Sequence, residues 1–308
     1  MINFLYCFDK NYVIQAQTSI NSLLNMVSEK VVINIICDHE PSSSQISEKI
    51  KNHNMLGGLN IYTFKQEDYD FPALTNAHVS SATYFRILID NFLPKDLGNV
   101  VYLDSDIICM NNPVEILKAT INNLKKQNLA IAAHGEGTRA EAPIIFNKLK
   151  LKSNNYFNAG VLVINYDYWV ENSISQSLLD IMKHRQDDLI FWDQDVLNIY
   201  IDGEFMNISE NLNYNYIELE NLDDKNVFFL HYAGKNKPWE VQNILNKYSQ
   251  IYQDNYFDLK LEKYHITFKK DKRTLIRFFQ ILITFEFMKL EKPLTYLRLS
   301  LKALVNDN

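Results

Sequence analysis

Residues 100–109 read VVYLDSDIIC, and this stretch constrains the fold and the chemistry more than any other. Its first four residues are β-branched, aromatic or aliphatic, a pattern that predicts a buried strand ending at Asp104. Two carboxylates, Asp104 and Asp106, are costly inside a core, but at the edge of a sheet they can share a divalent cation. A bare Asp-X-Asp is more simply interpreted as a solvated strand end. The rest of the chain therefore has to decide between a solvated strand end and a cation site.

Strand-like and helix-like segments alternate at the start of the chain. The sequence predicts strands at residues 3–8, 31–37 and 59–64, helices at 13–26 and 46–54, and a turn at Gly57 and Gly58. This βαβαβ order is typical of a mostly parallel sheet covered by helices. Residues 135–155 are polar and lack periodicity, which predicts a long loop of the kind that often binds or covers a ligand.

Five clusters of polar residues lie at the ends of predicted strands or open the helix that follows. They occupy residues 9–12, 104–106, 158–160, 193–195 and 231–239. In an open parallel sheet the carboxyl ends of the strands lie at one edge, where ligands bind. The sequence therefore predicts one shared ligand site.

Composition places the chain among ordinary globular proteins. Its 308 residues are 47% hydrophobic and 22% charged, enough for one large α/β domain or two small ones. Each of the three cysteines, Cys7, Cys37 and Cys109, ends an apolar run, which predicts buried, reduced thiols and a cytoplasmic protein. We expect no signal peptide and no membrane-spanning segment.

The charge is unevenly distributed. The whole chain has a net charge of −6, yet residues 269–302 contain nine basic and three acidic side chains. Residues 274–290 are mostly apolar and contain several phenylalanines, although Arg277, Glu286 and Lys289 interrupt them. A buried terminal helix is one interpretation. The basic flank favours another, an amphipathic segment on the anionic inner surface of the cell membrane. Nothing in the sequence predicts nucleic acid as a partner.

The polar motifs also match a known pattern. They are DKNY at 9–12, TYFR at 83–86, YLDSD at 102–106, FNAGV at 157–161, DQD at 193–195 and HYAGKNKPW at 231–239. In this order and at these spacings they resemble glycosyltransferase family 8, the retaining UDP-hexose transferases typified by bacterial lipopolysaccharide galactosyl- and glucosyltransferases. The resemblance covers residues 1–239. It implies a GT-A type nucleotide-sugar-binding domain with a mostly parallel, Rossmann-like sheet, which we expect at residues 1–262, and a membrane-associating tail at 263–308.

The resemblance implies a role for each matching residue. Asp104, Asp106 and His231 are expected to bind Mn²⁺ or Mg²⁺. Contacts with the UDP-sugar are implied for Asp9, Asn11, Tyr12, Arg86, Asp104, Ser105, Gly234, Lys235 and Lys237. Asn158, Asp193 and Gln194 are expected to line the sugar, with Gln194 beneath the anomeric carbon.

Two choices stay open at this point. The amide of Gln194 is a poor nucleophile, which favours front-side attack by the acceptor hydroxyl. Asp195 is a nearby carboxylate, however, so a double displacement through a covalent intermediate stays open as the alternative. His134 stands where galactosyl-transferring relatives often have an aspartate, so the donor can be UDP-galactose, UDP-glucose or another UDP-sugar. Lys10 replaces an acidic residue common in the first motif, and we expect this change at the surface to be tolerated.

Two other functions compete with the transferase. A phosphohydrolase of the haloacid dehalogenase type also has Asp-X-Asp after an apolar strand, but Ile107 and Ile108 stand where a small pair should follow. A non-enzymatic membrane scaffold would use the tail alone. The transferase, acting on a lipopolysaccharide or another cell-surface glycan, is the function that we expect.

Overall fold

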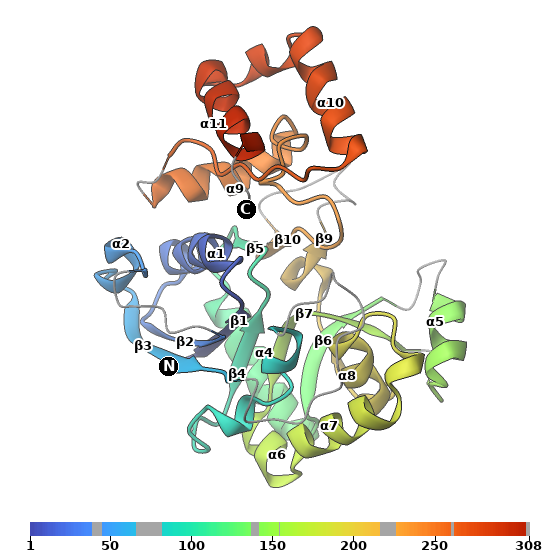
Figure 1. Cartoon of the computed structure of the whole chain (residues 1–308). Helices are drawn as coiled ribbons and strands as arrows, with labels where there is room; N and C mark the ends of the chain where they lie inside the picture. The colour runs from blue at the N-terminus through green and yellow to red at the C-terminus, as the bar shows by residue number, and fades with distance from the viewer. Residues whose placement is uncertain are drawn as a thin grey trace. The chain divides into compact units, whose positions relative to one another are not determined.

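The computed structural model divides the chain into two units. The described residues are 1–38, 45–65, 82–136, 142–153, 155–215, 226–259 and 262–305. Contacts divide the chain into one unit made of residues 1–214 and 223–229, and another made of 215–222 and 230–308. Figure 1 shows the elements of both.

The first unit is built around a seven-stranded sheet of order β3-β2-β1-β4-β7-β6-β8. Its strands are β1 (Asn3–Phe8), β2 (Val31–Cys37), β3 (Leu56–Thr63), β4 (Val100–Leu103), β6 (Ile131–Gly135), β7 (Phe157–Ile164) and β8 (Met206–Asn207). β7 runs antiparallel to β4 and β6, and the other neighbours pair in parallel. The fold is therefore α/β with a mixed, mostly parallel sheet, as predicted.

A second, three-stranded sheet has the order β5-β10-β9. Its strands are short: β5 (Ile107–Cys109), β9 (Tyr214–Asn215) and β10 (Phe229–His231). β5 begins three residues after Asp104, so the Asp-Ser-Asp segment is the connection between the two sheets.

Helices fill the connections between the strands of the first unit. They are α1 (Val13–Met26), α2 (Glu48–Lys51), α3 (Ala82–Phe85), α4 (Val114–Gln127), α5 (Ala142–Leu149), α6 (Tyr166–Glu171), α7 (Ile174–His184) and α8 (Asp193–Ile201). Buried side chains of α3, α6, α7 and α8 pack against β4, β6 and β7 in one hydrophobic core. This core fixes β4, β7 and the start of α8, which carry most of the site described below.

Several local predictions are confirmed and two are wrong. β1, α1 and β2 have the predicted bounds. Gly57 and Gly58 do not form a turn, because they lie inside β3, where Val32 pairs with Gly58. A Cβ at Gly57 would come within 3.2 Å of the Val31 carbonyl oxygen, a tight contact with backbone that favours glycine there. The predicted loop at 135–155 contains α5, which buries Leu149 and leaves Ile144 exposed.

The second unit is helical. It contains α9 (Lys247–Asp258), α10 (Lys272–Ile283), a 3₁₀ turn (Glu286–Lys289) and α11 (Pro293–Val305). Phe278 and Ile281 of α10 and Tyr296 of α11 belong to the same hydrophobic core as Val241 and Ile244. The boundary predicted between residues 262 and 263 thus lies within this unit, and residues 263–305 share a core with the segment before them.

Within the described residues, no helix is long and apolar enough to cross a membrane.

Candidate functional site

The Asp-Ser-Asp segment forms a tight turn between β4 and β5. The backbone N–H of Asp104 donates to the carbonyl of Gly160 at 2.9 Å, and the N–H of Ile107 donates to the carbonyl of Asp104 at 3.3 Å. Ser105 is buried, and its hydroxyl has no hydrogen-bond partner within the described part of the chain. A buried hydroxyl without a partner is costly, so this one is well placed to meet a polar ligand group.

Asp104, Asp106 and His231 form the predicted metal-ligand group. Each offers one ligand atom, and these atoms lie within 4.8 Å of one another. Asp106 is 8% exposed and His231 is 4% exposed. Two carboxylates and an imidazole are a donor set that suits Mn²⁺ and related divalent ions. The residues therefore fit the ion that the sequence predicts.

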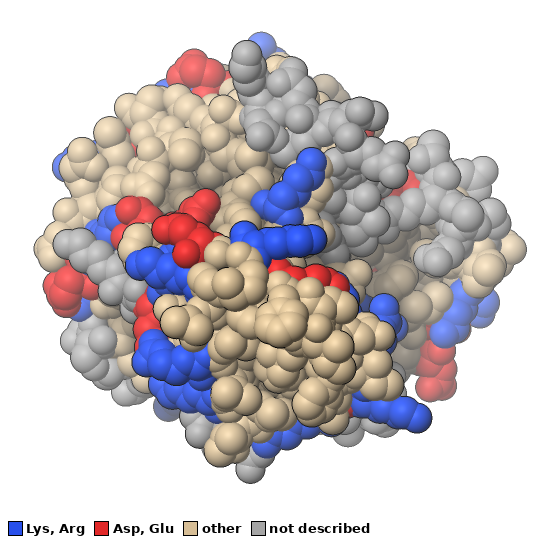
Figure 2. Space-filling view, turned by 90° about the horizontal axis from the view of Figure 1, so that it is seen from above, with Lys and Arg blue, Asp and Glu red and all other residues tan. Residues whose placement is uncertain are grey.

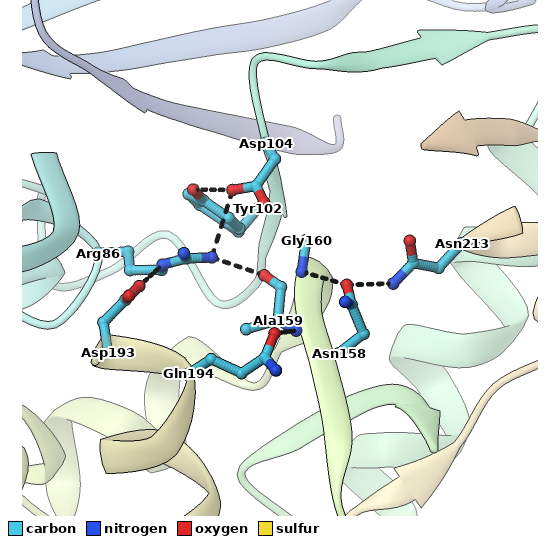
Figure 3. Close-up of polar contacts among 9 residues, drawn as sticks. All are labelled: Arg86, Tyr102, Asp104, Asn158, Ala159, Gly160, Asp193, Gln194 and Asn213. Atoms are coloured by element: carbon cyan, nitrogen blue, oxygen red, sulfur yellow. Dashed lines mark hydrogen bonds and ion pairs between the residues drawn. The ribbon is translucent and has the colours of Figure 1, made fainter. Parts of the chain in front are cut away.

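Arg86 connects two of the predicted clusters (Figure 3). Its Nε–H donates to Asp193, while Nη1 donates to Asp104 Oδ1 at 3.3 Å and to the carbonyl of Ala159 at 2.7 Å. The guanidinium lies 4.8 Å from the ring centroid of Tyr102, whose hydroxyl donates to Asp104 Oδ1 at 2.5 Å. One buried cation thus holds α8, β4 and β7 at fixed positions around the Asp-Ser-Asp turn.

The environment of Asp193 shifts its titration. Burial raises the pKa of this carboxyl to about 6, and the charge of Asp104 adds to the rise, while the guanidinium of Arg86 opposes it. The guanidinium of Arg86 thus stabilises the ionised form of Asp193 against the cost of its burial.

Asn158 and Gln194 are both held by the start of β7. Asn158 Oδ1 accepts from the backbone N–H of Gly160 at 2.9 Å and from Asn213 Nδ2 at 3.0 Å. Gln194 Oε1 accepts from the backbone N–H of Ala159 at 3.0 Å. Figure 3 shows both amides beside the Arg86 network. The Asn158 and Gln194 side chains are therefore ordered by contacts with the protein itself.

The DKNY motif lies where β1 ends and α1 begins. The Asp9 carboxylate accepts from the backbone N–H of Asn11 at 2.8 Å, and the N–H of Tyr12 donates to the Asp9 carbonyl at 3.0 Å. β1 and β4 are parallel neighbours, with Leu5 opposite Tyr102, so this motif and the Asp-Ser-Asp turn share one edge of the sheet. That common edge is the arrangement predicted from the sequence.

The glycine–lysine segment belongs to the second unit. Gly234 is exposed with φ +82°, a left-handed conformation that favours glycine. Lys235 is exposed, whereas the half-buried Lys237 donates from Nζ to the carbonyl of Tyr232 at 2.9 Å. The contacts of Gly234, Lys235 and Lys237 with a diphosphate stay a prediction.

Sequence reasoning missed several side chains that complete this network. Tyr102 and Tyr156 resemble ordinary strand residues, and Asn213 lies outside the polar motifs that match the family pattern. One feature of the sequence could have identified Tyr102: it stands two residues before Asp104, which directly follows the same strand, so the extended chain turns both side chains to the same side.

Comparison with known proteins decides the family. The sequence profile described as "Glycosyl transferase family 8" matches residues 3–243, most of the chain. This chain belongs to glycosyltransferase family 8. It is thus a retaining glycosyltransferase, and the predicted resemblance is confirmed.

Curated relatives of this family 8 member include two enzymes of lipopolysaccharide synthesis. A lipopolysaccharide 1,3-galactosyltransferase of Salmonella typhimurium is 29% identical over 252 residues, which cover 77% of this chain and 72% of the relative. A lipopolysaccharide 1,2-glucosyltransferase of Escherichia coli is 25% identical over 269 residues, covering 82% of this chain and 78% of the relative.

Solved structures agree on the fold of the family 8 chain. The galactosyltransferase LgtC, crystallised with donor and acceptor sugar analogues, superposes with a TM-score of 0.69 at 19% identity, covering 84% of this chain and 97% of LgtC. The glycosyltransferase GlyE of Streptococcus pneumoniae gives a TM-score of 0.62 at 18% identity, covering 92% of this chain and 64% of GlyE. Both likenesses support the GT-A fold.

Proposed function

We propose that this family 8 enzyme transfers a hexose from a UDP-sugar to a saccharide acceptor, with a divalent ion held by Asp104, Asp106 and His231. The observation that supports the proposal most strongly is this carboxylate–imidazole group, with Asp104 also contacting Arg86. Membership of family 8 leaves the phosphohydrolase and the non-enzymatic scaffold without support.

The ion, when bound, supplies a Lewis acid for the diphosphate of the donor. The residues of the chain perform the remaining tasks. The Asp9 turn and Tyr12 are proposed to hold the uridine, and the unpartnered hydroxyl of Ser105 to meet the ribose. Arg86, Asn158 and Asp193 are proposed to orient the sugar. Lys235 and Lys237, with the backbone at Gly234, supply positive charge and N–H donors for the diphosphate.

Gln194 is proposed to face the anomeric carbon. Its amide oxygen is a dipole that can stabilise positive charge developing on the sugar ring, although the amide is a poor nucleophile. We therefore propose front-side attack. The acceptor hydroxyl forms the new glycosidic bond as the bond to UDP breaks, and its proton passes to the departing phosphate oxygen.

The donor hexose and the acceptor are proposed from the relatives. Two of them act in lipopolysaccharide synthesis, one as a galactosyltransferase and one as a glucosyltransferase. We propose galactose or glucose as the hexose and a lipopolysaccharide or related cell-surface glycan as the acceptor. His134 pairs with Asn158 in the sheet, so its side chain lies near the proposed sugar position.

We further propose that the second unit binds the anionic inner surface of the cell membrane, which would place the enzyme in the cytoplasm. Ile276, Phe279 and Ile283 of α10 are exposed and recur at helical spacing on one face. Leu294, Leu301 and Val305 of α11 repeat this arrangement. In the view of Figure 2, basic side chains and fewer acidic ones border a broad area of uncharged residues. Apolar surface with a basic border is the chemistry that binds anionic lipid.

The deciding experiment for the transferase is a donor screen. Purified protein is incubated with Mn²⁺ and each of several UDP-hexoses, first with water and then with lipid-linked saccharides as acceptors, and UDP release is measured. We expect UDP release from one hexose above the others, and its loss on chelation. If no UDP-sugar is turned over in the presence of Mn²⁺ or Mg²⁺ and acceptor, the proposed function is wrong.

A further inference from the structure

Asp195 is the most completely buried carboxylate of the DQD motif, and the proposed front-side mechanism does not use it. It is 0% exposed, and each of its two carboxylate oxygens accepts hydrogen bonds from neighbouring groups of the protein. Oδ2 accepts from the backbone N–H groups of Ile190 and Phe191 at 2.5 and 2.6 Å. Oδ1 accepts from the hydroxyl of Tyr156 at 2.5 Å. Both oxygens are therefore occupied by donors, and neither faces a substrate.

Tyr156 continues the chain of hydrogen bonds to Gln194. The amide nitrogen of Gln194 donates to the Tyr156 hydroxyl oxygen at 2.9 Å, and Gln194 Oε1 accepts from the Ala159 N–H at 3.0 Å. Four groups are thus linked in series, from the buried carboxylate through the phenol and the amide to the backbone of β7.

The direction of each hydrogen bond is fixed by the chemistry of the two ends. An ionised carboxylate only accepts, so the single phenolic proton of Tyr156 must point to Asp195. The phenol oxygen can then only accept, and it accepts from the amide NH₂ of Gln194. A backbone N–H only donates, so the amide oxygen must face Ala159. Both ends select the same orientation of an amide that could otherwise flip.

We propose that Asp195 and Tyr156 are positioning residues that hold the Gln194 amide in one orientation, rather than Asp195 being a nucleophile. This inference rests on the proposed role of Gln194 beside the anomeric carbon. It explains why a carboxylate is buried next to Gln194, and it removes the support for a double displacement through Asp195. The chain of hydrogen bonds lies wholly within the first unit.

Tyr156→Phe tests the proposal because it removes only the phenol oxygen. Without this acceptor only the N–H of Ala159 still selects the orientation of the amide, and we expect kcat to fall roughly tenfold, the equivalent of one hydrogen bond, with little change in the donor KM. Tyr166→Phe is the matched control, because Tyr166 is also fully buried and its hydroxyl donates to the carbonyl of Leu93 at 3.1 Å. Tyr166→Phe should reduce stability to a similar extent without changing kcat.

Asp195→Asn tests the direction of the chain. Its amide must keep an oxygen toward the N–H groups of Ile190 and Phe191, so its NH₂ faces Tyr156 and forces the phenolic proton toward Gln194. That reversal would place the Gln194 NH₂ against the Ala159 N–H. We expect Asp195→Asn to lower kcat more than Tyr156→Phe does, and the double variant to return to the level of Tyr156→Phe.

A spectroscopic readout separates this inference from the proposed function. The side-chain ¹⁵N signal of Gln194, assigned with Gln194→Ala, should shift in Tyr156→Phe and stay in place in Tyr166→Phe. An unshifted signal in Tyr156→Phe overturns the inference even if the enzyme turns over no UDP-sugar. In an active enzyme, a wild-type kcat in Tyr156→Phe, or a glycosyl adduct on Asp195 found by mass spectrometry, overturns it while leaving the transferase intact.

Discussion

The guanidinium of Arg86 and the carboxylate of Asp193 form an ion pair that is almost inaccessible to water. The two side chains are 15% and 7% exposed, and the same guanidinium also contacts Asp104. Charges in such a place are stable only together, because each alone would lose its hydration without compensation. The pair therefore fixes the first turn of α8, which carries Gln194, relative to the end of β4.

Arg86→Gln should destabilise the protein strongly. The substitution leaves Asp193 buried without its cation, and breaking a buried pair in this way costs about 3 to 5 kcal/mol. The free energy of unfolding of the first unit, measured in urea, should fall by this amount. Lys125→Gln is the control: Lys125 pairs with Asp167 at 2.8 Å, with both side chains about half exposed, and it should cost less than about 1 kcal/mol. Equal losses of unfolding free energy in Arg86→Gln and Lys125→Gln would contradict the prediction.

Asp106→Asn should abolish metal binding without unfolding the protein. One charged ligand is replaced by a weaker neutral one in a group of three, so Mn²⁺ titrated into the variant should give little heat by calorimetry. UDP binding should lose its dependence on Mn²⁺ at the same time. Asp167→Asn removes a carboxylate outside the group and should bind Mn²⁺ as the wild type does. Full activity of the wild type after exhaustive chelation would falsify the metal assignment.

Gln194→Ala should lower kcat more than it weakens donor binding. The amide is proposed to act on charge that develops only in the transition state, and removing one such group typically costs about 100-fold in kcat. The dissociation constant for the UDP-sugar, measured separately, should change little. The anomeric coupling constant of the first-formed product should show an α linkage by NMR. A β linkage, or equal losses in kcat and affinity, would rule this account out.

The regular part of the fold was predictable from the sequence because its signals are local. β1, α1 and β2 follow directly from apolar runs and helical spacing. Gly57 and Gly58 were misread because a pair of glycines usually marks a turn, whereas here both lie inside a strand, where the Val31 carbonyl leaves little room for a side chain at Gly57.

The polar clusters were predictable as a set, but the hydrogen bonds that join their residues were not. Motif spacing identified Arg86, Asp104, Asp193 and Gln194. It could not show that Arg86 joins Asp193 to Asp104, nor that Tyr156 joins Asp195 to Gln194, because these hydrogen bonds link residues up to 107 positions apart. Such contacts depend on the packing of β4, β7 and α8 in three dimensions.

The stability of the second unit should fall at acidic pH because of His265. This ring is buried, its Nδ1 bonds the hydroxyl of Tyr252 at 2.7 Å, and it stacks against Trp239 and Tyr256. Burial lowers its pKa to about 4, from 6.5 in an unfolded chain. The unfolded state therefore binds the proton more readily than the folded state. The contribution of neutral His265 to the free energy of unfolding is complete above pH 6.5 and is lost as the pH falls toward 4.

The loss of unfolding free energy between pH 6.5 and 4 follows from the pKa shift of His265, at 1.36 kcal/mol per pKa unit, and amounts to about 3 kcal/mol. Urea unfolding monitored by Trp239 fluorescence measures it. Asp193 titrates in the same pH range, and because burial raises its pKa, its effect on the unfolding free energy has the opposite sign. The pH dependence of the wild type alone therefore does not separate the two groups. His265→Gln removes one titrating group and should flatten the slope. An unchanged slope in His265→Gln would show that other groups govern the acid transition.

The exposed face of α10 and α11 should retain the protein on anionic membranes. Deleting residues from Arg273 onward is a poor test, because it would remove Phe278, Ile281 and Tyr296 from the core that also holds Val241. Phe279 and Ile283 are better targets, since they are 54% and 76% exposed. Burying each in a bilayer contributes about 2 kcal/mol, and each basic residue near the surface about 1 kcal/mol.

Phe279→Ser combined with Ile283→Ser should therefore reduce co-sedimentation with vesicles of phosphatidylglycerol and phosphatidylcholine by a large factor, while turnover of a soluble acceptor stays unchanged. Ile144→Ser is the matched control, because Ile144 is 69% exposed but lies on α5, outside the second unit. Raising the salt concentration should weaken retention of the wild type, since ions screen the basic side chains. An anionic surface is contradicted as the partner if the wild type binds pure phosphatidylcholine equally well and salt does not weaken its binding. If the double variant is retained on the vesicles, the contact lies elsewhere on the protein.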